Sequence, residues 1–136
     1  LPEMEKWSML GREPIFMPSV GSFAQGMVVS VPLHYEQLNE VGRSAERLQA
    51  CLSERYADGT YVSVRDLNRM DDLERGAFMR PDSLANTNKL ELSVYANDVK
   101  RTAVLVARLD NLGKGASGAA VQNMNLALGL EETSGL

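Results

Sequence analysis

The chain has 136 residues, 44% of them hydrophobic and 24% charged, which is the length and composition of one folded domain. Its net charge of -4 offers no basic surface to nucleic acid, and no apolar run approaches the roughly 18 residues that a membrane-spanning helix needs. The single cysteine, Cys51, excludes an internal disulfide and favours a reducing compartment, so we expect a cytoplasmic protein.

The expected elements follow from apolar spacing and from turn residues. In chain order they are a helix over 2–10, strands over 14–20 and 27–33, a helix over 36–58, a strand over 60–64, a loop over 66–83, a hairpin of strands 90–96 and 101–109, and a helix over 115–128. Strands that cluster with few crossovers predict an α+β fold, in which a mainly antiparallel sheet has helices on one face.

Particular residues and stretches of the sequence make these predictions more specific. Pro18 confines the strand over 14–20 to an edge, because proline cannot donate to a neighbouring strand. Leu38, Leu48 and Leu52 belong to one apolar stripe at helical spacing, so 36–58 is predicted as a single long helix. The charged stretch 65–80 mixes signs and predicts a solvated loop, and the scattered methionines are expected to fill the core.

The start of the last predicted helix is rich in small residues, from Gly115 to Ala120. Such residues allow either tight packing of the helix or close approach of a ligand, and free amides at a helix start can also receive an anion. The residues by themselves favour the packing interpretation.

The segment Asp110-Asn-Leu-Gly-Lys-Gly-Ala116, continued by Ala120-Val-Gln-Asn123, resembles the DNLxKGAxxxAVQ signature of the semialdehyde dehydrogenase superfamily. The continuation to Leu136 resembles the N-acetyl-gamma-glutamyl-phosphate reductases within it. The resemblance implies that 1–136 is a substrate and dimerisation domain with a fold like the C-terminal domain of glyceraldehyde-3-phosphate dehydrogenase. It also implies that helix 115–128 packs on a nucleotide-binding domain outside this chain, and that Leu1, which is not a methionine, begins an excised piece.

The same resemblance assigns site residues in three further segments. Residues 1–5 resemble the stretch after the family's His-x-His motif, with Glu3 lining the substrate site. The stretch 16–27 resembles a family substrate loop, and it contributes Ser19, Gln25 and Gly26. Histidine is frequent in the family at the first of these positions and arginine at the second; Gln25 can donate a hydrogen bond there, but without the charge-assisted strength of a guanidinium.

Two more segments complete the expected site. The loop 84–90 resembles the family loop that enters the hairpin, and Asn86 is its matching residue for substrate binding. Asn111 and Gly115 are the expected contacts with NADP, Asn111 at the nicotinamide end. No metal site is expected.

The parent protein implied by the resemblance reduces N-acetyl-gamma-glutamyl phosphate with NADPH in arginine biosynthesis, as a homo-oligomer. The nucleophilic cysteine and the Gly-x-Gly-x-x-Gly nucleotide motif are absent from these 136 residues, so we expect no catalytic residue in the chain and no activity from it alone. Cys51 is predicted to be a small core residue, and His34 a turn or capping residue. The alternatives are a related aminoadipyl-phosphate or aspartate-semialdehyde reductase, and a non-catalytic self-association module.

Overall fold

The computed structural model describes residues 2–9 and 11–136. Four strands form one sheet in the order β1-β4-β3-β2. They are β1 (Met27–His34), β2 (Val62–Val64), β3 (Leu90–Asn97) and β4 (Thr102–Leu109). The neighbours β1, β4 and β3 are antiparallel, and only the short β2 runs parallel to β3. The predicted α+β fold with a mainly antiparallel sheet is therefore confirmed.

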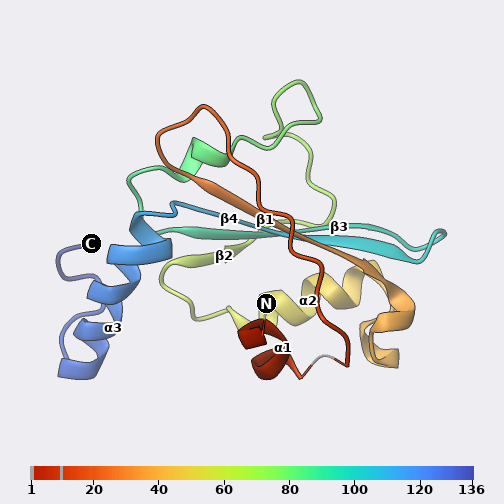
Figure 1. Ribbon diagram of the computed structural model, residues 1–136, viewed down its shortest axis with the longest axis horizontal. Helices are drawn as coiled ribbons and strands as arrows, with labels where there is room; N and C mark the ends of the chain where they lie inside the picture. The colour runs from red at the N-terminus through yellow and green to blue at the C-terminus, as the bar shows by residue number, and fades with distance from the viewer. Residues whose placement is uncertain (1, 10) are drawn as a thin grey trace.

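Three α-helices accompany the sheet (Figure 1). Helix α2 (Ala45–Arg55) packs on β3 and β2, while α1 (Pro2–Ser8) lies on the same side of the sheet and has no buried residue. Helix α3 (Gly118–Leu128) stands beyond one end of the sheet (Figure 1). None of the helices in the described ranges is long and apolar enough to cross a membrane.

The core lies between α2 and the sheet. Directly opposed residues of antiparallel strands share a face, so Val94 of β3 and Leu105 of β4 point together toward Leu48 of α2. Val94 is fully buried and Leu48 is 9% exposed. The same face of β1 is less covered, and its Val29 and Val31 remain more than two-fifths exposed. Helix α2 thus covers one half of this face.

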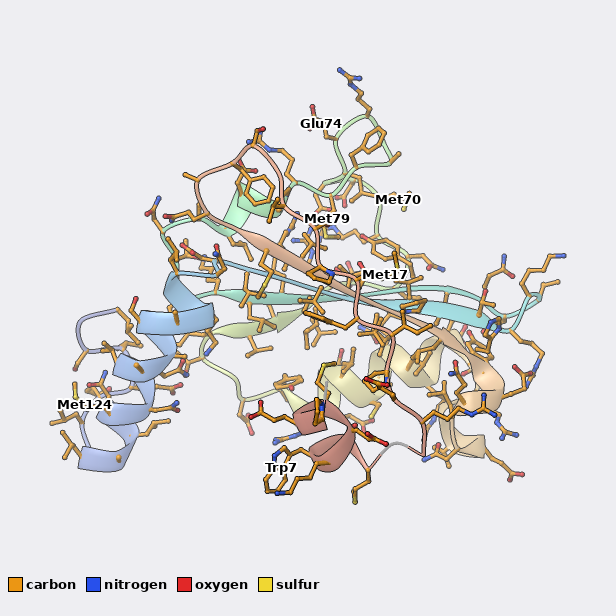
Figure 2. All side chains as sticks on the ribbon, in the orientation of Figure 1. Trp7, Met17, Met70, Glu74, Met79 and Met124 are labelled. Carbon is orange, nitrogen blue, oxygen red and sulfur yellow. The ribbon has the colours of Figure 1, made fainter. Side chains whose placement is uncertain are left out.

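The strand predicted over 14–20 is wrong, because these residues have no regular secondary structure. Pro14 and Pro18 remove two donors that a strand needs, and no neighbouring strand lies alongside. Ile15 is 90% and Met17 85% exposed, so the apolar character of the segment reflects no packing inside this chain (Figure 2).

The single helix predicted over 36–58 is also wrong. The 3-10 turns η1 (Tyr35–Gln37) and η2 (Glu40–Gly42) precede α2, which begins only at Ala45. The Asn39 side chain accepts a hydrogen bond from the Gly42 amide, and the Ser44 hydroxyl accepts one from the Arg47 amide. Each of these polar side chains caps the start of the element that follows it, so the chain forms separate short elements, which apolar spacing does not reveal.

Two predictions about burial are wrong as well. Cys51 is exposed, because it lies off the stripe of α2 that carries Ala45, Leu48 and Leu52. Six methionines are exposed and so do not fill the core, as Figure 2 illustrates for several of them: Met4, Met9, Met17, Met27, Met70 and Met124.

The charged stretch 65–80 is only partly a solvated loop. Arg65 forms salt bridges with Asp72 and Glu91, at 3.1 Å and 3.0 Å. Arg108 of β4, whose side chain is 7% exposed, bridges the same two carboxylates. These four charges tie the loop to the face of the sheet opposite α2. The turn η3 (Pro81–Leu84) then leads back to β3.

Candidate functional site

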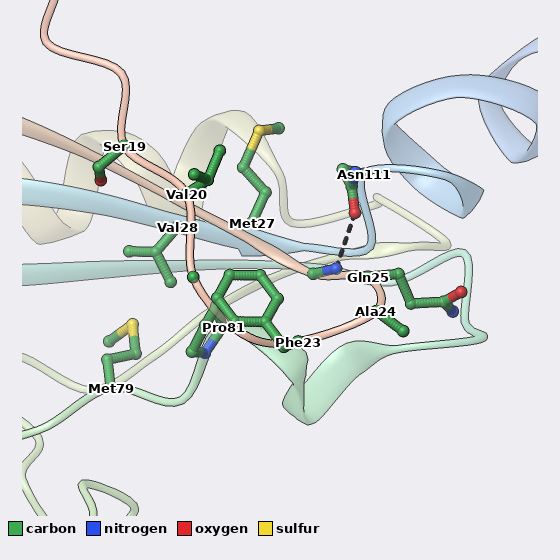
Figure 3. Close-up of a pocket in the computed structure, with 12 residues that line it drawn as sticks. Ser19, Val20, Phe23, Ala24, Gln25, Met27, Val28, Met79, Pro81 and Asn111 are labelled. Carbon is green, nitrogen blue, oxygen red and sulfur yellow. Dashed lines mark hydrogen bonds between the residues drawn. The ribbon is translucent and has the colours of Figure 1, made fainter.

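A cavity of about 490 Å³ lies where the loop 19–26 meets the end of β4 (Figure 3). Three of the predicted site residues on that loop line it, namely Ser19, Gln25 and Gly26. Asn111, from the signature segment, lines the same cavity although it is 85 positions from Gly26. The structure therefore brings together four of the predicted site residues.

Asn111 is fixed by one hydrogen bond. Its side-chain Oδ1 accepts from the Gly26 amide at 2.7 Å (Figure 3). Because the oxygen is occupied in this way, the orientation of the carboxamide is set. Its Nδ2 donates to no acceptor within the described part of the chain, so this nitrogen remains for a ligand.

Gly26 can only be glycine in this arrangement. Its φ of +125° lies in a region that residues with a side chain rarely adopt. A Cβ at this position would also lie 2.3 Å from the Pro81 carbonyl oxygen. The loop thus closes onto η3 with its backbone, which presents the Gly26 amide to Asn111.

Asp110 stands at the centre of the polar contacts and is 1% exposed. Its Oδ1 accepts from the amides of Leu112 and Gly113, at 2.8 Å and 3.1 Å. Its Oδ2 accepts from the Asn86 amide at 2.6 Å and from Gln25 Nε2 at 2.8 Å. Burial by itself raises the pKa of the Asp110 carboxyl, but the donated bonds from these amides and from Gln25 outweigh it, so the pKa is lowered and the group stays charged.

The helix start does not offer two of its amides to an anion. Free amides that receive an anion were one of the two possibilities for this region, yet those of Leu112 and Gly113 already donate to Asp110. The first turn is also not α-helical, since η4 (Gly113–Ser117) is a π-helical turn before α3. Gly115 lies in this turn and donates its amide to the Asp110 carbonyl. π-helical turns of this kind recur at functional sites.

Asn86 does not line the cavity, but it contacts Gln25, which does. Gln25 Nε2 donates to Asn86 Oδ1 at 2.9 Å as well as to Asp110. Asn86 has a φ of +60°, a left-handed conformation that asparagine tolerates better than most residues. The Gln25 amide nitrogen is therefore used within the chain, and Asn86 is joined to the site through it.

Two predicted residues lie apart from this cluster. Glu3 is exposed on α1, on the α2 side of the sheet, and it is not among the residues that line the cavity (Figure 1). Gly115 does not line the cavity either, although it is one turn of chain from Asn111. His34 ends β1 and its backbone amide donates to the Gln37 side chain, as expected of a residue at a turn. No group of residues suited to a metal ion occurs among the described residues.

Sequence reasoning did not single out several contributors to the site, among them Asp110, Phe23, Met79 and Pro81. An aspartate whose side chain binds the amides two and three positions later is a recognisable local motif, so Asp110 could have been expected to hold the turn after β4. Its bonds to Gln25 and Asn86 join distant parts of the sequence, and no local signal predicts them.

The fold and the signature segment agree with the comparisons to known proteins. Residues 1–111 match the family described as semialdehyde dehydrogenase, dimerisation domain, and the chain belongs to this family. It is similar to proteins named N-acetyl-gamma-glutamyl-phosphate reductase. One from Trichormus variabilis is 43% identical over 98% of this chain, and one from Rhizobium johnstonii is 47% identical over 94% of it. The chain spans only 41% and 40% of the length of these two relatives.

Proposed function

We propose that the chain is the substrate and dimerisation domain of a reductase that converts N-acetyl-gamma-glutamyl phosphate to the semialdehyde, with release of phosphate, in the cytoplasm. The observation that carries this is the Asn111–Gly26 bond, which joins the signature segment to the loop that lines the cavity. The names of the relatives supply the substrate, and the family description supplies the self-association.

In this proposal a cysteine thiolate outside the chain attacks the acyl carbon and displaces phosphate, leaving a thioester. NADPH, when bound, supplies the hydride that reduces the acyl carbon and expels the thiolate. Asn111 suits a nicotinamide cofactor, since its fixed carboxamide has Nδ2 left to donate. The loop 19–26 holds the acyl phosphate beside it, with the Ser19 hydroxyl as a donor, while the Gly26 amide is occupied by Asn111.

The residues of this chain supply positions and polarity but no nucleophile. Cys51 is exposed on α2 and does not line the cavity. The loop that lines the cavity also carries no cation, because Gln25 stands between Ala24 and Gly26 where the family often has arginine. Phosphate must therefore be bound by neutral donors here or by groups from outside the chain.

We further propose that α3 packs on a nucleotide-binding domain of the same protein. Met124 and Leu128, four residues apart on one face of α3, are each more than half exposed, a pattern typical of a helix whose apolar side is covered by something else. Figure 2 shows Met124 on the side of α3 that faces away from the sheet.

The test is to express the complete reading frame that encodes this chain and to follow NADPH consumption with three acyl phosphates. We expect turnover of N-acetyl-gamma-glutamyl phosphate well above that of the aminoadipyl and aspartyl analogues. A preference for one of the analogues would assign the domain to that related reductase, and no turnover with any of them would favour a self-association module. The 136-residue chain alone should be inactive, so NADPH-dependent release of phosphate from it would contradict the proposal.

A further inference from the structure

Three separate segments that form the candidate site contact one buried carboxylate. Asp110 binds the loop 19–26 through Gln25, the loop before β3 through the Asn86 amide, and the turn before α3 through the amides of Leu112 and Gly113. Its own carbonyl accepts from the Gly115 amide as well. Every one of these bonds is donated to Asp110, so it acts as the common acceptor for the cluster.

Asp110 does not line the cavity, but its neighbour Asn111 does. The turn that follows Asp110 determines where the Asn111 side chain points, and the position of Gln25 determines where the adjoining Gly26 amide lies. The Asn111–Gly26 bond at 2.7 Å thus joins two segments that are both hydrogen-bonded to the same carboxylate.

We propose that Asp110 is a positioning residue that sets the Asn111–Gly26 bond, and through it the geometry of the site. The part of this inference that concerns turnover rests on the proposed function, and the part that concerns the bond itself does not. The charged form is required, because a carboxylate has acceptor sites for all four donors and no hydrogen to oppose them.

Asparagine at position 110 would fail for a specific reason. One of its two side-chain positions carries an NH₂ group, which would face either the pair of donors from Asn86 and Gln25 or the pair from Leu112 and Gly113. Whichever way the amide turns, two donors lose their acceptor in a buried place, and the segment that carries them should detach.

The first measurement is hydrogen exchange of backbone amides in Asp110→Asn and in the unsubstituted chain. The informative amide is that of Gly26, which bonds to Asn111 and not to Asp110. We expect its protection to fall at least about tenfold, which corresponds to about 1.4 kcal/mol. Protection should fall with it either at Asn86 or at both Leu112 and Gly113, according to which way the new amide turns. Unchanged protection at Gly26 would overturn the proposal.

The matched control is Asp98→Asn, at another aspartate whose side chain serves as a common acceptor. Asp98 accepts from the Tyr35 hydroxyl and from the Ala45 amide, far from the cavity. Asp98→Asn should reduce the free energy of unfolding, but it should leave the protection of the Gly26 amide in the native state unchanged. If Asp110→Asn does not fold, Gln25→Ala is the second variant, because it removes one of the bonds to Asp110 from a partly exposed position. It should also lower the protection of the Gly26 amide. Unchanged protection of that amide in Gln25→Ala would equally overturn the proposal.

The second measurement is steady-state kinetics of the complete protein. We expect Asp110→Asn to lower kcat at least about tenfold, since small displacements of positioning groups are costly to catalysis, while Asp98→Asn keeps the original kcat. Equal kcat in the two variants would contradict the role in turnover. An inactive unsubstituted protein would instead defeat the proposed function, and the exchange experiment would still decide the role of Asp110 in the Asn111–Gly26 bond.

Discussion

At the scale of single residues, the site depends on contacts that each tolerate only one type of residue. Gly26 combines a positive φ with a 2.3 Å approach of its missing Cβ to Pro81, and Asp110 combines burial with four donated bonds. Neither residue would attract notice by its type alone, because glycine and aspartate are common in loops. Their importance comes from what surrounds them.

Gly26→Ala should lower the free energy of unfolding by at least about 2 kcal/mol, because it adds backbone strain to a clash with the Pro81 carbonyl. Chemical denaturation measures this directly. Gly76→Ala is the matched control, since Gly76 also has a positive φ but has nothing within 4 Å of its missing Cβ. A loss at position 26 no larger than the loss at position 76 would show that the close approach is unimportant.

The Tyr35 hydroxyl should make the stability of the fold depend on pH. Burial, followed by the hydrogen bond to Asp98, raises the pKa of the Tyr35 hydroxyl to about 12. The folded state therefore favours the protonated hydroxyl, so its contribution is complete below about pH 10 and is lost as the pH rises from about 10 to about 12. Urea unfolding on both sides of pH 10 should show the decline, and Tyr35→Phe should remove it. A decline of the same size in Tyr35→Phe would assign it to other groups.

At the scale of elements, the charges on the face of the sheet opposite α2 hold the loop 66–80 in place. Arg108 is the most buried of them, and it contacts Glu91 at 2.5 Å and Asp72 at 2.9 Å. Arg65, the residue that follows β2, joins the same two carboxylates. Two positive and two negative groups thus balance, so removal of one leaves a partner unpaired.

Arg108→Met should reduce the free energy of unfolding by about 3 kcal/mol, because it keeps much of the side-chain volume but leaves two carboxylates beside a single arginine. Arg69→Met is the control, at an arginine that pairs with the exposed Asp71, and it should lower the free energy of unfolding far less than Arg108→Met. Similar losses in the two variants would mean that the buried network contributes no more than a surface pair.

At the scale of the whole molecule, substantial apolar surface lies outside the core. Of the two strands β1 and β4, only β1 carries large hydrophobic side chains that are exposed. Met27, Val29 and Val31 share one face of β1 and are 36–46% exposed. This surface agrees with membership in a family described as a dimerisation domain.

The chain should therefore self-associate, and Val29→Lys should weaken the association by placing a charge on that face. Size-exclusion chromatography with light scattering measures the mass of each form. Val99→Lys is a control on the hairpin turn, where an exposed apolar residue lies away from β1. A monomer before substitution, or equal effects of the two variants, would contradict this use of β1.

The spacing of apolar residues along the chain was sufficient to predict much of the fold. The expected strands 27–33, 90–96 and 101–109 correspond to β1, β3 and β4, because alternation of apolar residues depends only on neighbours along the chain. The helix over 36–58 and the strand over 14–20 failed where side-chain bonds and missing partners, rather than spacing, decide the backbone. For the site, the family resemblance named Asn111, Gly26 and Gln25, which the structure brings together.

The sequence by itself thus determined the family, the main strands and the residues to consider, since each depends on order along one chain. Only the tertiary structure decided that the Gln25 side-chain nitrogen donates to Asn86 and Asp110, and that the Gly26 amide fixes the Asn111 side chain. The physical reason is that a buried carboxylate needs hydrogen-bond donors, and the fold decides which segments lie close enough to supply them. The partners of Asp110 lie up to 85 positions away, beyond the reach of any local pattern.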